Sequence, residues 1–415
     1  MFRNRRSILL LIGVLLSLLG HTLAADQIEA ITIEGLKRTK EDTLLRIINL
    51  SPGDEVTPGL SEEVEQKLRK AGIFQEDMSV TFTPGREGQI LNIRVYDKWT
   101  LIGLPYFSSS DGDIKGGVFA LDSNMGGKGN YFVSALMFSN EGDGLGFFFF
   151  NDPTFLDTDY KGKLVLNGGF STQTNTSLDG DEIWEDYQTA LASLGVGLGK
   201  DVNDSLNLSL LTRGTFWEDR EGDIAPPEEG EAHFDLILEG RAEYDGLTVY
   251  PLFQKGMSGK MSASARWEPA EGDTSYLLYG EFSAAWAIDS LLQLTATGKS
   301  ALTNDDFHYL FRLGDASGSL TLPSDKIATD RYLNGELKGE VRLVKIGEAG
   351  YLTSPLYYEA GVLRDYQEEE QTYHGMGGGI RFYLNKVALP AMGLDYRYNL
   401  TTDEGAVSFF IGMSY

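Results

Sequence analysis

The chain has 415 residues, no cysteine and a formal net charge of −26. This charge argues against nucleic acid as a partner, because the phosphates would repel the protein, and the lack of cysteine excludes stabilisation by disulfides. The 49 glycines against 12 prolines, with 20 tyrosines and 22 phenylalanines, favour β structure.

The first 24 residues have the three parts of a secretory signal peptide. Arg3, Arg5 and Arg6 form a basic start, residues 8–19 form an apolar run, and Thr22-Leu23-Ala24 is a small-residue cleavage site. The run is shorter than the roughly 20 apolar residues that a spanning helix needs. We therefore expect cleavage at residue 24 rather than an uncleaved membrane anchor, and we expect no spanning helix later in the chain.

Residues 27–97 alternate between strand and helix periods. "IEAITIEG" predicts a short strand that ends at Gly35, and "TKEDTLLRIINL" predicts a helix opened by Thr39. "TPGLSEEVEQKLRKAG" predicts a second helix, stopped by Gly72, and "DMSVTFTP" and "GQILNIRVYD" predict two alternating strands. We therefore expect one small α+β domain at residues 25–97, with both helices on one face of its sheet.

From Trp99 to the last residue the pattern has the period of β-strands. In "RYLNGELKGEVRL", Leu333 and Leu337 alternate with charged residues such as Glu336 and Lys338, and "AMGLDYRYNLT" behaves in the same way. A soluble sheet would not bury so many unpaired charges, whereas a barrel with lipid outside and water or a polar plug inside requires them. We count about sixteen strands and predict a transmembrane antiparallel β-barrel at residues 98–415.

The connections between these strands are expected to alternate between short turns and longer, more acidic loops. The acidic run at residues 217–232 is expected to be such a loop, and an even strand count places both barrel ends beside the small domain.

"GFFFFN" (residues 146–151) does not alternate, and the glycines at 377–379 predict a bend in a strand. The last strand is predicted to face lipid with alternate residues up to its end: Val407, Phe409, Ile411, Met413 and Tyr415.

The order of elements in residues 27–97, with "GLKRTKEDTLLRIINLSPGD" and "LRKAGIFQEDMSVTFTP", resembles a POTRA domain. A single POTRA domain followed by a sixteen-stranded barrel resembles the BamA/TamA superfamily of assembly and secretion barrels, of the bacterial surface antigen type. Supporting stretches are "YDKWTLIGLPYFSSSDGD" at the junction, "FRLGD" in the longest late loop, "YYEAGV", "GMGGGIRF" and the final "FFIGMSY".

One departure from the family concerns this late loop, between the eleventh and twelfth strands. The resemblance implies an Arg-Gly-aromatic motif whose arginine reaches acidic groups on the inner wall, but Thr321, Leu322 and Pro323 stand at that place. Two inward carboxylates remain, Glu340 and Glu359, and burying both without a partner would be costly. Either water or a loop cation pairs with them, and we expect Arg312 rather than Lys326 or Arg331.

The seam where the barrel closes is predicted to be weak. Pro105 cannot donate to a sheet ladder, and Gly103 and Gly412 supply no side chain to pack, although a local bulge explains the same residues. The residues that we assign to function are therefore a client-strand edge (Met78, Ser79, Val80, Thr81, Phe82, Thr83), late-loop and inner-wall contacts (Arg312, Gly314, Glu340, Glu359) and a lateral seam (Gly103, Pro105, Gly412, Tyr415).

Two classes of function follow, both in the outer membrane of a Gram-negative bacterium with the small domain in the periplasm. The resemblance implies assembly or insertion of outer-membrane proteins, or translocation of a polypeptide, with extended clients bound by β-augmentation. The alternative is a passive pore or surface barrel. The expected partners are outer-membrane lipids, unfolded polypeptides and other assembly subunits. The histidines are scattered without metal-ligand spacing, and no hydrolase or phosphate-binding motif occurs, so we expect no enzyme, cofactor or metal site.

Overall fold

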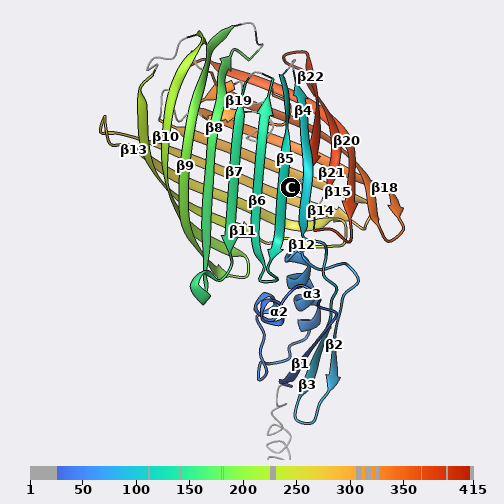
Figure 1. The fold of residues 1–415 in the computed structure, drawn as a ribbon. Helices are drawn as coiled ribbons and strands as arrows, with labels where there is room; N and C mark the ends of the chain where they lie inside the picture. The colour runs from blue at the N-terminus through green and yellow to red at the C-terminus, as the bar shows by residue number, and fades with distance from the viewer. Residues whose placement is uncertain are drawn as a thin grey trace, which may run out of the picture.

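The computed structural model describes residues 26–415 except 111–112, 141, 179, 181, 225–229, 305–310, 314–318, 323–326, 366, 389–390 and 412–415. The predicted signal peptide and the predicted site residues Gly314, Gly412 and Tyr415 lie outside the described residues. Figure 1 shows two parts, a β-barrel and a small domain at one of its ends.

The small domain has the predicted order of strand, helix, helix, strand and strand. Its elements are β1 (Ile28–Glu34), α2 (Glu41–Ile48), α3 (Leu60–Lys70), β2 (Ser79–Pro84) and β3 (Gln89–Arg94). The sheet has the order β1-β3-β2, with β1 parallel and β2 antiparallel to β3. Leu60, Val64 and Leu68, on one face of α3, are buried in the core with Leu44 of α2 and Leu91 of β3, as the helical period predicts.

Thr39 does not open the first helix as expected. Lys40 occupies the N-cap position of α2 and makes no side-chain cap, while the Thr39 hydroxyl donates a hydrogen bond to Asp97 Oδ1 at 2.5 Å. The Thr39 side chain therefore bonds to Asp97 at the end of the small domain and does not cap the helix.

Sixteen long strands, counted over the described residues, form the wall of the closed barrel, which confirms the predicted fold class. They are β4 (Leu101–Ser110), β5 (Asp113–Met125), β6 (Asn130–Ser139), β7 (Gly144–Asp152), β8 (Tyr160–Thr176), β9 (Ile183–Asn203), β10 (Leu206–Ile224), β11 (Ala232–Asp245), β13 (Gln254–Glu268), β14 (Asp273–Ile288), β15 (Leu292–Thr303), β18 (Arg331–Ile346), β19 (Gly350–Arg364), β20 (Glu370–Leu384), β21 (Met392–Asn399) and β22 (Glu404–Ile411). The two-residue β12 (Thr248–Val249) pairs only with β13, beside a turn, and η1 (Phe155–Asp157) lies between β7 and β8. No helix among the described residues has the length and apolar character needed to cross a membrane.

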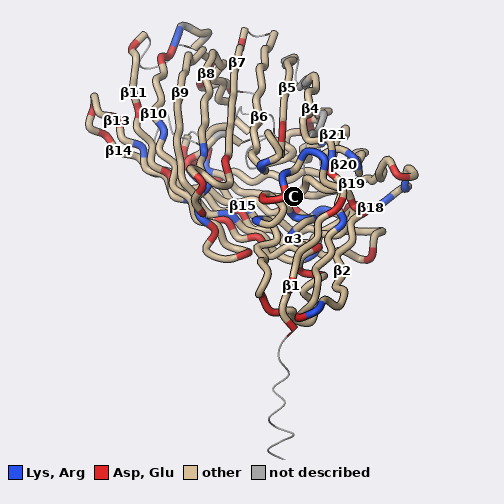
Figure 2. The backbone as a smooth tube through the Cα atoms, turned by 60° about the horizontal axis from the view of Figure 1, so that its bottom comes forward, with Lys and Arg blue, Asp and Glu red and all other residues tan. Residues whose placement is uncertain are grey.

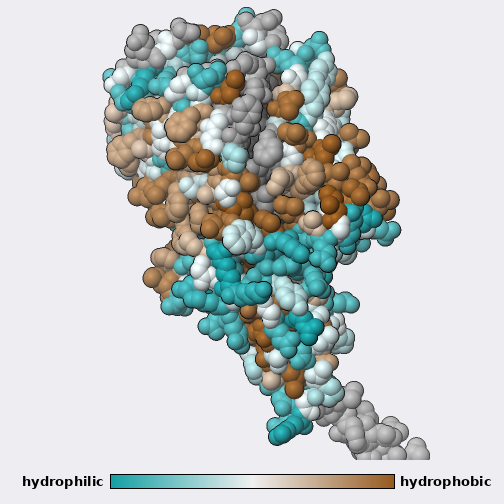
Figure 3. Space-filling view, turned by 45° about the vertical axis from the view of Figure 1, so that its right-hand side comes forward, coloured by the Kyte–Doolittle hydropathy of each residue, from teal (hydrophilic) through white to brown (hydrophobic). Residues whose placement is uncertain are grey.

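The predicted alternation of side chains is present in the wall. Leu337 of β18 is 65% exposed on the outer face, whereas its neighbour Lys338 is 4% exposed and faces the interior. Val407 of β22 is likewise exposed and Ser408 buried. Figure 2 shows charged residues along the wall strands, and Figure 3 shows hydrophobic side chains gathered over the barrel above its hydrophilic junction with the small domain.

The pairing of β7 accounts for the segment that does not alternate. Phe148 pairs with Leu166 of β8 on the outer face, whereas Phe147 pairs with Ala135 of β6 and faces the interior. Phe149 also faces the interior. The four phenylalanines therefore divide between the two faces, and the wall is apolar on both sides at this point.

The expectation of an acidic loop is wrong for residues 217–224 of the run at 217–232, and residues 225–229 lie outside the described residues. Residues 217–224 continue β10, and β11 begins at residue 232. The reason is the length of the strands: β9 and β10 have 21 and 19 residues, so they carry acidic side chains well past the apolar part of the wall. The connection that is long by comparison with the others is the late loop, residues 304–330.

Candidate functional site

The described parts of the late loop, residues 311–313, 319–322 and 327–330, pack on the inner wall of the barrel. Its short strands β16 (Phe311–Leu313) and β17 (Ile327–Thr329) pair with each other. Leu313, Leu322 and Ile327 are buried against wall residues that include Tyr332 and Leu363. On the other side the backbone N–H of Ala328 donates to Asn175 Oδ1 of β8 at 3.1 Å. The loop therefore crosses the interior near the end of the barrel that is remote from the small domain.

Glu359 on β19 is the point at which this loop is fixed to the wall. Its carboxylate, which is 1% exposed, accepts hydrogen bonds from Ser319 Oγ at 2.6 Å, the Leu320 N–H at 2.9 Å, and the Thr321 N–H and hydroxyl at 2.6 and 2.5 Å. Asn334 Nδ2 donates from the wall at 3.2 Å. Hydrogen bonds to a charged acceptor are stronger than neutral ones, so five neutral donors can hold a buried carboxylate. In the described part of the chain, Glu359 is held by neutral donors, and the expected loop cation Arg312 stays a prediction because its side chain lies outside the described residues.

Glu340 on β18 does pair with a cation, but the cation comes from the wall. Arg381 Nη1 of β20 lies 3.6 Å from Glu340 Oε2, and its Nη2 lies 3.0 Å from Asp395 Oδ2 of β21. Thr353 and Tyr383 donate hydroxyl hydrogen bonds to Glu340 Oε1 at 2.6 and 2.8 Å. The sequence analysis missed Arg381, although its alternation with Ile380 in "GMGGGIRF" places it on the inner face.

Of the three loop cations expected beside these carboxylates, the structure describes the side chain of Arg331 alone. Arg331 Nη2 lies 3.5 Å from Glu370 Oε1, in an exposed ion pair at the strand ends. Lys326 lies outside the described residues. Arg312 pairs with Ala328 in the backbone ladder of β16 and β17, and its side chain is outside the described part of the chain. The structure thus brings Glu340 and Glu359 onto one inner wall without assigning Arg312 a role there.

In the part of the chain that the structure describes, the seam between the first and last wall strands is sparsely paired. In the described residues β22 and β4 share one ladder position, Val407 with Ser109, whereas β4 pairs with β5 along its whole length. Gly103 and Pro105 lie on the exposed outer face of β4, opposite Ala120 and Val118. Residues 412–415, which include the predicted seam residues Gly412 and Tyr415, lie outside the described residues, so the weakness of the whole seam stays a prediction.

The predicted client edge is an edge strand of the small domain. Among the described strands β2 pairs with β3 alone, so its other edge presents backbone groups that this sheet does not use. Val80 and Phe82 pack against the core, whereas Ser79, Thr81 and Thr83 are exposed; Met78 precedes the strand and packs on the core.

A network of polar contacts joins the small domain to the β5–β6 turn. Arg38 forms an ion pair with Asp122, and Asn124 Nδ2 donates to Thr39 Oγ1 at 2.7 Å. The Lys40 N–H donates to the Gly127 carbonyl at 2.9 Å. Gly127 has a φ of +73°, and a Cβ there would stand 2.1 Å from the Arg38 carbonyl oxygen. Only glycine allows this close approach of the two backbones.

Asp97 organises the domain side of this junction. Its carboxylate accepts hydrogen bonds from the backbone N–H groups of Lys37 and Arg38 at 2.8 and 2.6 Å, and from Thr39. Burial by itself would raise the pKa of Asp97, but the hydrogen bonds outweigh burial and lower the pKa from its ordinary value. The charged carboxylate is therefore the form that fits the junction.

Further contacts reach turns around the same end of the barrel. Lys67 Nζ lies 3.2 Å from Asp204 Oδ2, and Lys70 Nζ lies 3.4 Å from Asp245 Oδ1. The Val249 N–H donates to Gln66 Oε1 at 2.9 Å. Tyr351 donates to Glu76 at 3.4 Å, and the Trp99 N–H donates to the Lys386 carbonyl at 2.8 Å. These contacts show that the small domain lies across the end of the barrel.

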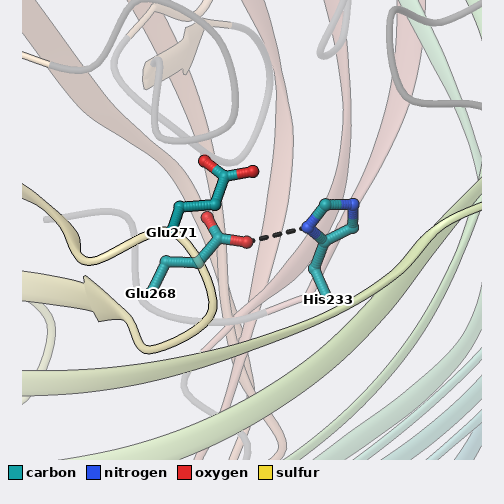
Figure 4. A group of neighbouring side chains, drawn as sticks. All are labelled: His233, Glu268 and Glu271. Atoms are coloured by element: carbon teal, nitrogen blue, oxygen red, sulfur yellow. Dashed lines mark hydrogen bonds and ion pairs between the residues drawn. The ribbon is translucent and has the colours of Figure 1, made fainter.

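A second inward cluster lies on β10, β11 and β13 (Figure 4). His233 Nδ1 lies 2.7 Å from Glu268 Oε1, and Glu271 lies beside them, so that ligand atoms of the three residues fall within 4.8 Å of one another. Arg266 Nη2 lies 3.1 Å from the other oxygen of Glu268, and His233 stacks on Trp217 with centroids 4.0 Å apart. The set could hold a cation, but the guanidinium already bonded to Glu268 opposes one. Sequence spacing did not reveal this cluster, because strand register creates it.

The comparisons with known proteins support the same architecture. Residues 27–98 match the family model for POTRA, described as a surface antigen variable number repeat. No match was found among curated proteins. Similar solved structures are BamA from Haemophilus ducreyi lacking POTRA domains 1-3 (14% identity, TM-score 0.55, 92% of this chain and 84% of that one), CdiB from Acinetobacter baumannii (11%, 0.60, 94% and 74%) and CdiB from Escherichia coli (11%, 0.60, 93% and 77%). At these identities the likeness is one of fold.

Proposed function

We propose, from its BamA/TamA-like architecture of one POTRA domain and a sixteen-stranded barrel, that this chain works in the outer membrane on extended polypeptides. The reaction is the insertion of outer-membrane proteins into the bilayer or the passage of a polypeptide across it. The POTRA domain stands in the periplasm, and outer-membrane lipids surround the apolar outer face of the wall.

The weakly paired seam is the observation that carries this proposal. The pair between Val407 and Ser109 is the single ladder position described between β22 and β4. A strand edge that its neighbour leaves unpaired offers backbone donors and acceptors to another extended chain. A client segment that pairs with this edge would continue the wall and then move sideways into lipid.

The free edge of β2 fits an earlier step of the same process. Backbone pairing along an edge recognises an extended chain with little regard to its side chains, which suits a protein with many clients. The POTRA domain lies across the barrel end, so a client held on β2 is held on the side of the barrel that this domain occupies. Other assembly subunits would bind the remaining POTRA surface.

The seam is tested by a disulfide. The chain has no native cysteine, so Ser109→Cys with Val407→Cys gives a single cross-strand pair at the register position that joins β4 to β22. In liposomes that contain the purified protein, insertion of a urea-denatured outer-membrane barrel is measured by its heat-modifiable gel mobility. The disulfide should abolish insertion, and reduction should restore it.

The matched control places the disulfide between two strands that are paired along their length. Ala284 and Ala296 are register partners on the outer face of β14 and β15, and a disulfide between cysteines there should leave insertion unchanged. Full cross-linking of the seam pair with undiminished insertion would reject the proposal.

The second function, a passive pore or surface barrel, is favoured by one observation. Thr321 binds Glu359 at the place where the family resemblance implies an Arg-Gly-aromatic motif, so family activity need not accompany the fold. An intact seam disulfide with unchanged solute conductance and no insertion activity in the wild-type protein would support this function instead.

A further inference from the structure

The turn between β7 and β8, residues 153–159, exposes apolar side chains beyond the strands of the wall. The exposed fraction of Leu156 is 77%, the highest among the large apolar side chains that the structure describes, and that of Phe155 is 40%. The β9–β10 and β18–β19 turns at the same end of the barrel carry Asp204 and Glu348 instead. Exposure of large apolar groups to water is unfavourable, so this turn favours a covered surface.

The β7–β8 turn is held by its own hydrogen bonds in a backbone conformation that leucine rarely adopts. The Asp157 N–H donates to the Thr154 carbonyl at 2.9 Å, and the Thr158 hydroxyl donates to the Phe155 carbonyl at 2.6 Å. Leu156 and Asp157 have φ values of +54° and +56°, in the left-handed region. The hydrogen bonds keep the exposed leucine in place, so the apolar surface exists before anything covers it.

Phe155 joins the turn to the outer face of the wall. Gly162 of β8 is the register partner of Leu198 of β9, which is 48% exposed on the outer face. A Cβ at Gly162 would stand 2.6 Å from the Phe155 ring, so the ring lies over the glycine on that face. The apolar surface of the turn is therefore continuous with the surface that faces lipid.

Tyr160 and Lys200 mark the boundary of the bilayer beside this turn. They are register partners on the outer face, and Lys200 Nζ lies 5.2 Å from the centroid of the Tyr160 ring. Tyrosine and lysine are typical of the level of the lipid headgroups, where the ammonium group meets phosphate. Leu156 precedes Tyr160 by four residues and lies at or just beyond this level. The carboxylates of Asp157 and Asp159 exclude a position deep in the hydrocarbon.

Arg46 of α2 connects the same turn to the POTRA domain. Its Nη1 donates to Thr154 Oγ1 at 3.5 Å, and its Nη2 donates to the Lys128 carbonyl of the β5–β6 turn at 2.6 Å. Figure 1 shows the POTRA domain at this end of the barrel. A contact between the β7–β8 turn and lipid would therefore hold the end that carries the domain at a fixed level of the membrane.

We propose that the β7–β8 turn is an anchor that inserts Phe155 and Leu156 into the headgroup region of the phospholipid leaflet on the POTRA side. The partner is a lipid surface, because the turn continues the lipid-facing wall and Lys200 beside it complements a lipid phosphate. Gly162 makes the anchor possible, since a side chain there would displace Phe155 from the wall. This inference rests on the membrane location in the proposed function and is independent of the insertion of clients.

The chain has no native cysteine, so Leu156→Cys can carry a single nitrobenzoxadiazole fluorophore. The labelled protein is placed in phospholipid nanodiscs, which leave both faces open to solution, and quenching by iodide and by nitroxide lipids is measured. Glu348→Cys, on a polar turn at the same end, is the matched control, and Leu337→Cys marks the hydrocarbon. Iodide quenching should be at least about three-fold weaker at position 156 than at position 348. A nitroxide near the headgroup should quench position 156 more than one near the end of the acyl chain, and the order should be reversed at position 337.

Two further substitutions, made in the labelled Leu156→Cys protein, test the contact between the ring and the glycine. Gly162→Ala and, separately, Phe155→Ser should each raise iodide quenching at least about two-fold, whereas Phe155→Leu should not. Gly240→Ala is the control, because a Cβ there meets no atom closer than 4.0 Å. Heat-modifiable gel mobility shows that each variant is folded, and Phe155→Ser, in an exposed turn, serves where Gly162→Ala does not fold.

Equal iodide quenching at positions 156 and 348, with position 337 protected, would reject the anchor and leave the membrane location standing. Loss of protection at position 337 would reject that location itself. Stronger quenching of position 156 by the deep nitroxide would place the turn in the hydrocarbon and overturn the inference. Protection in native outer membranes that is absent in nanodiscs would assign the turn to a protein partner and reject a lipid one.

Discussion

At the scale of single residues, Glu359 shows how neutral donors hold a buried carboxylate in the described part of the chain. The loop residues Ser319, Leu320 and Thr321 direct two hydroxyl and two backbone donors at one carboxylate. Such donors are fixed by the fold of the loop, so they are correctly placed only when the loop is docked. The contact therefore reports on whether the loop is in the interior.

The substitution Thr321→Val removes the shortest of these bonds while keeping the shape of the side chain. One hydrogen bond to a charged group contributes about 1.5–3 kcal/mol, so the docked loop should be destabilised by that order. Protease cleavage within residues 304–330 should become faster, and single-channel conductance should rise. Arg312→Ala is the comparison: because Glu359 has neutral partners, it should leave both quantities unchanged, and an equal effect of the two substitutions would contradict our assignment.

Asp97 gives the junction a dependence on pH whose sign can be worked out. Its pKa is lower in the folded protein than in the unfolded chain, so its contribution to stability is complete above the unfolded pKa of about 3.9 and is lost as the pH falls through the folded value. Hydrogen exchange at residues 37–40 should therefore accelerate below about pH 4. In Asp97→Asn the exchange should be fast already at pH 7 and less dependent on pH; an unaltered acid dependence would place the titrating group elsewhere.

At the scale of elements, the edge of β2 can be tested through its backbone alone. The N–H groups of successive residues in β2 point alternately to β3 and to the free edge. One of the two substitutions Val80→Pro and Thr81→Pro therefore removes a donor of the bonds to β3, and the other removes a donor at the free edge. The variant that keeps a folded POTRA domain, judged by circular dichroism, should lower client insertion about ten-fold, which is about 1.4 kcal/mol. Thr81→Ala should have little effect. Full activity of a folded proline variant at both positions would exclude pairing at this edge.

Much of this architecture follows from period alone. The alternation of Leu337 with Lys338 predicts a lipid face and an inner face, and the helical period of Leu60, Val64 and Leu68 predicts the POTRA core. Arg381 and the cluster around His233 were missed because partners on neighbouring strands are set by register, which no single strand encodes. The inner phenylalanines of β7 were unexplained for a related reason: without register, an unbroken apolar run does not say which residues face inward.

At the scale of the whole molecule, the POTRA domain and the late loop close opposite ends of one interior. The domain is held by separate contacts at several places on the barrel end. One of these contacts is the ion pair between Arg38 and Asp122. The attachment of the domain is therefore divided over several separate polar contacts.

Arg38→Asp should open this end, because it places two carboxylates against each other. Conductance in planar bilayers should increase, and reversal of the partner in Arg38→Asp with Asp122→Arg should bring it back toward the wild-type value. Such rescue requires a direct interaction between the two side chains. An unchanged conductance in the single variant would show that the domain does not limit the passage of ions.

The pair between Ser109 and Val407 also has a consequence for how this protein itself is made. The two residues stand near opposite ends of the barrel sequence, so their contact closes almost the longest loop that the chain can form and carries the greatest cost in chain entropy of any wall pair. Of the other neighbouring pairs of wall strands, β15 and β18 are joined by the late loop, and the rest are joined by shorter connections from which pairing can begin. Closure of the barrel is therefore the pairing step that a nearby turn assists least. Before closure, the newly made chain forms a curved sheet with two unpaired edges. During that interval it has the same exposed edges as the clients we assign to it, and a second, mature copy would be suited to complete it.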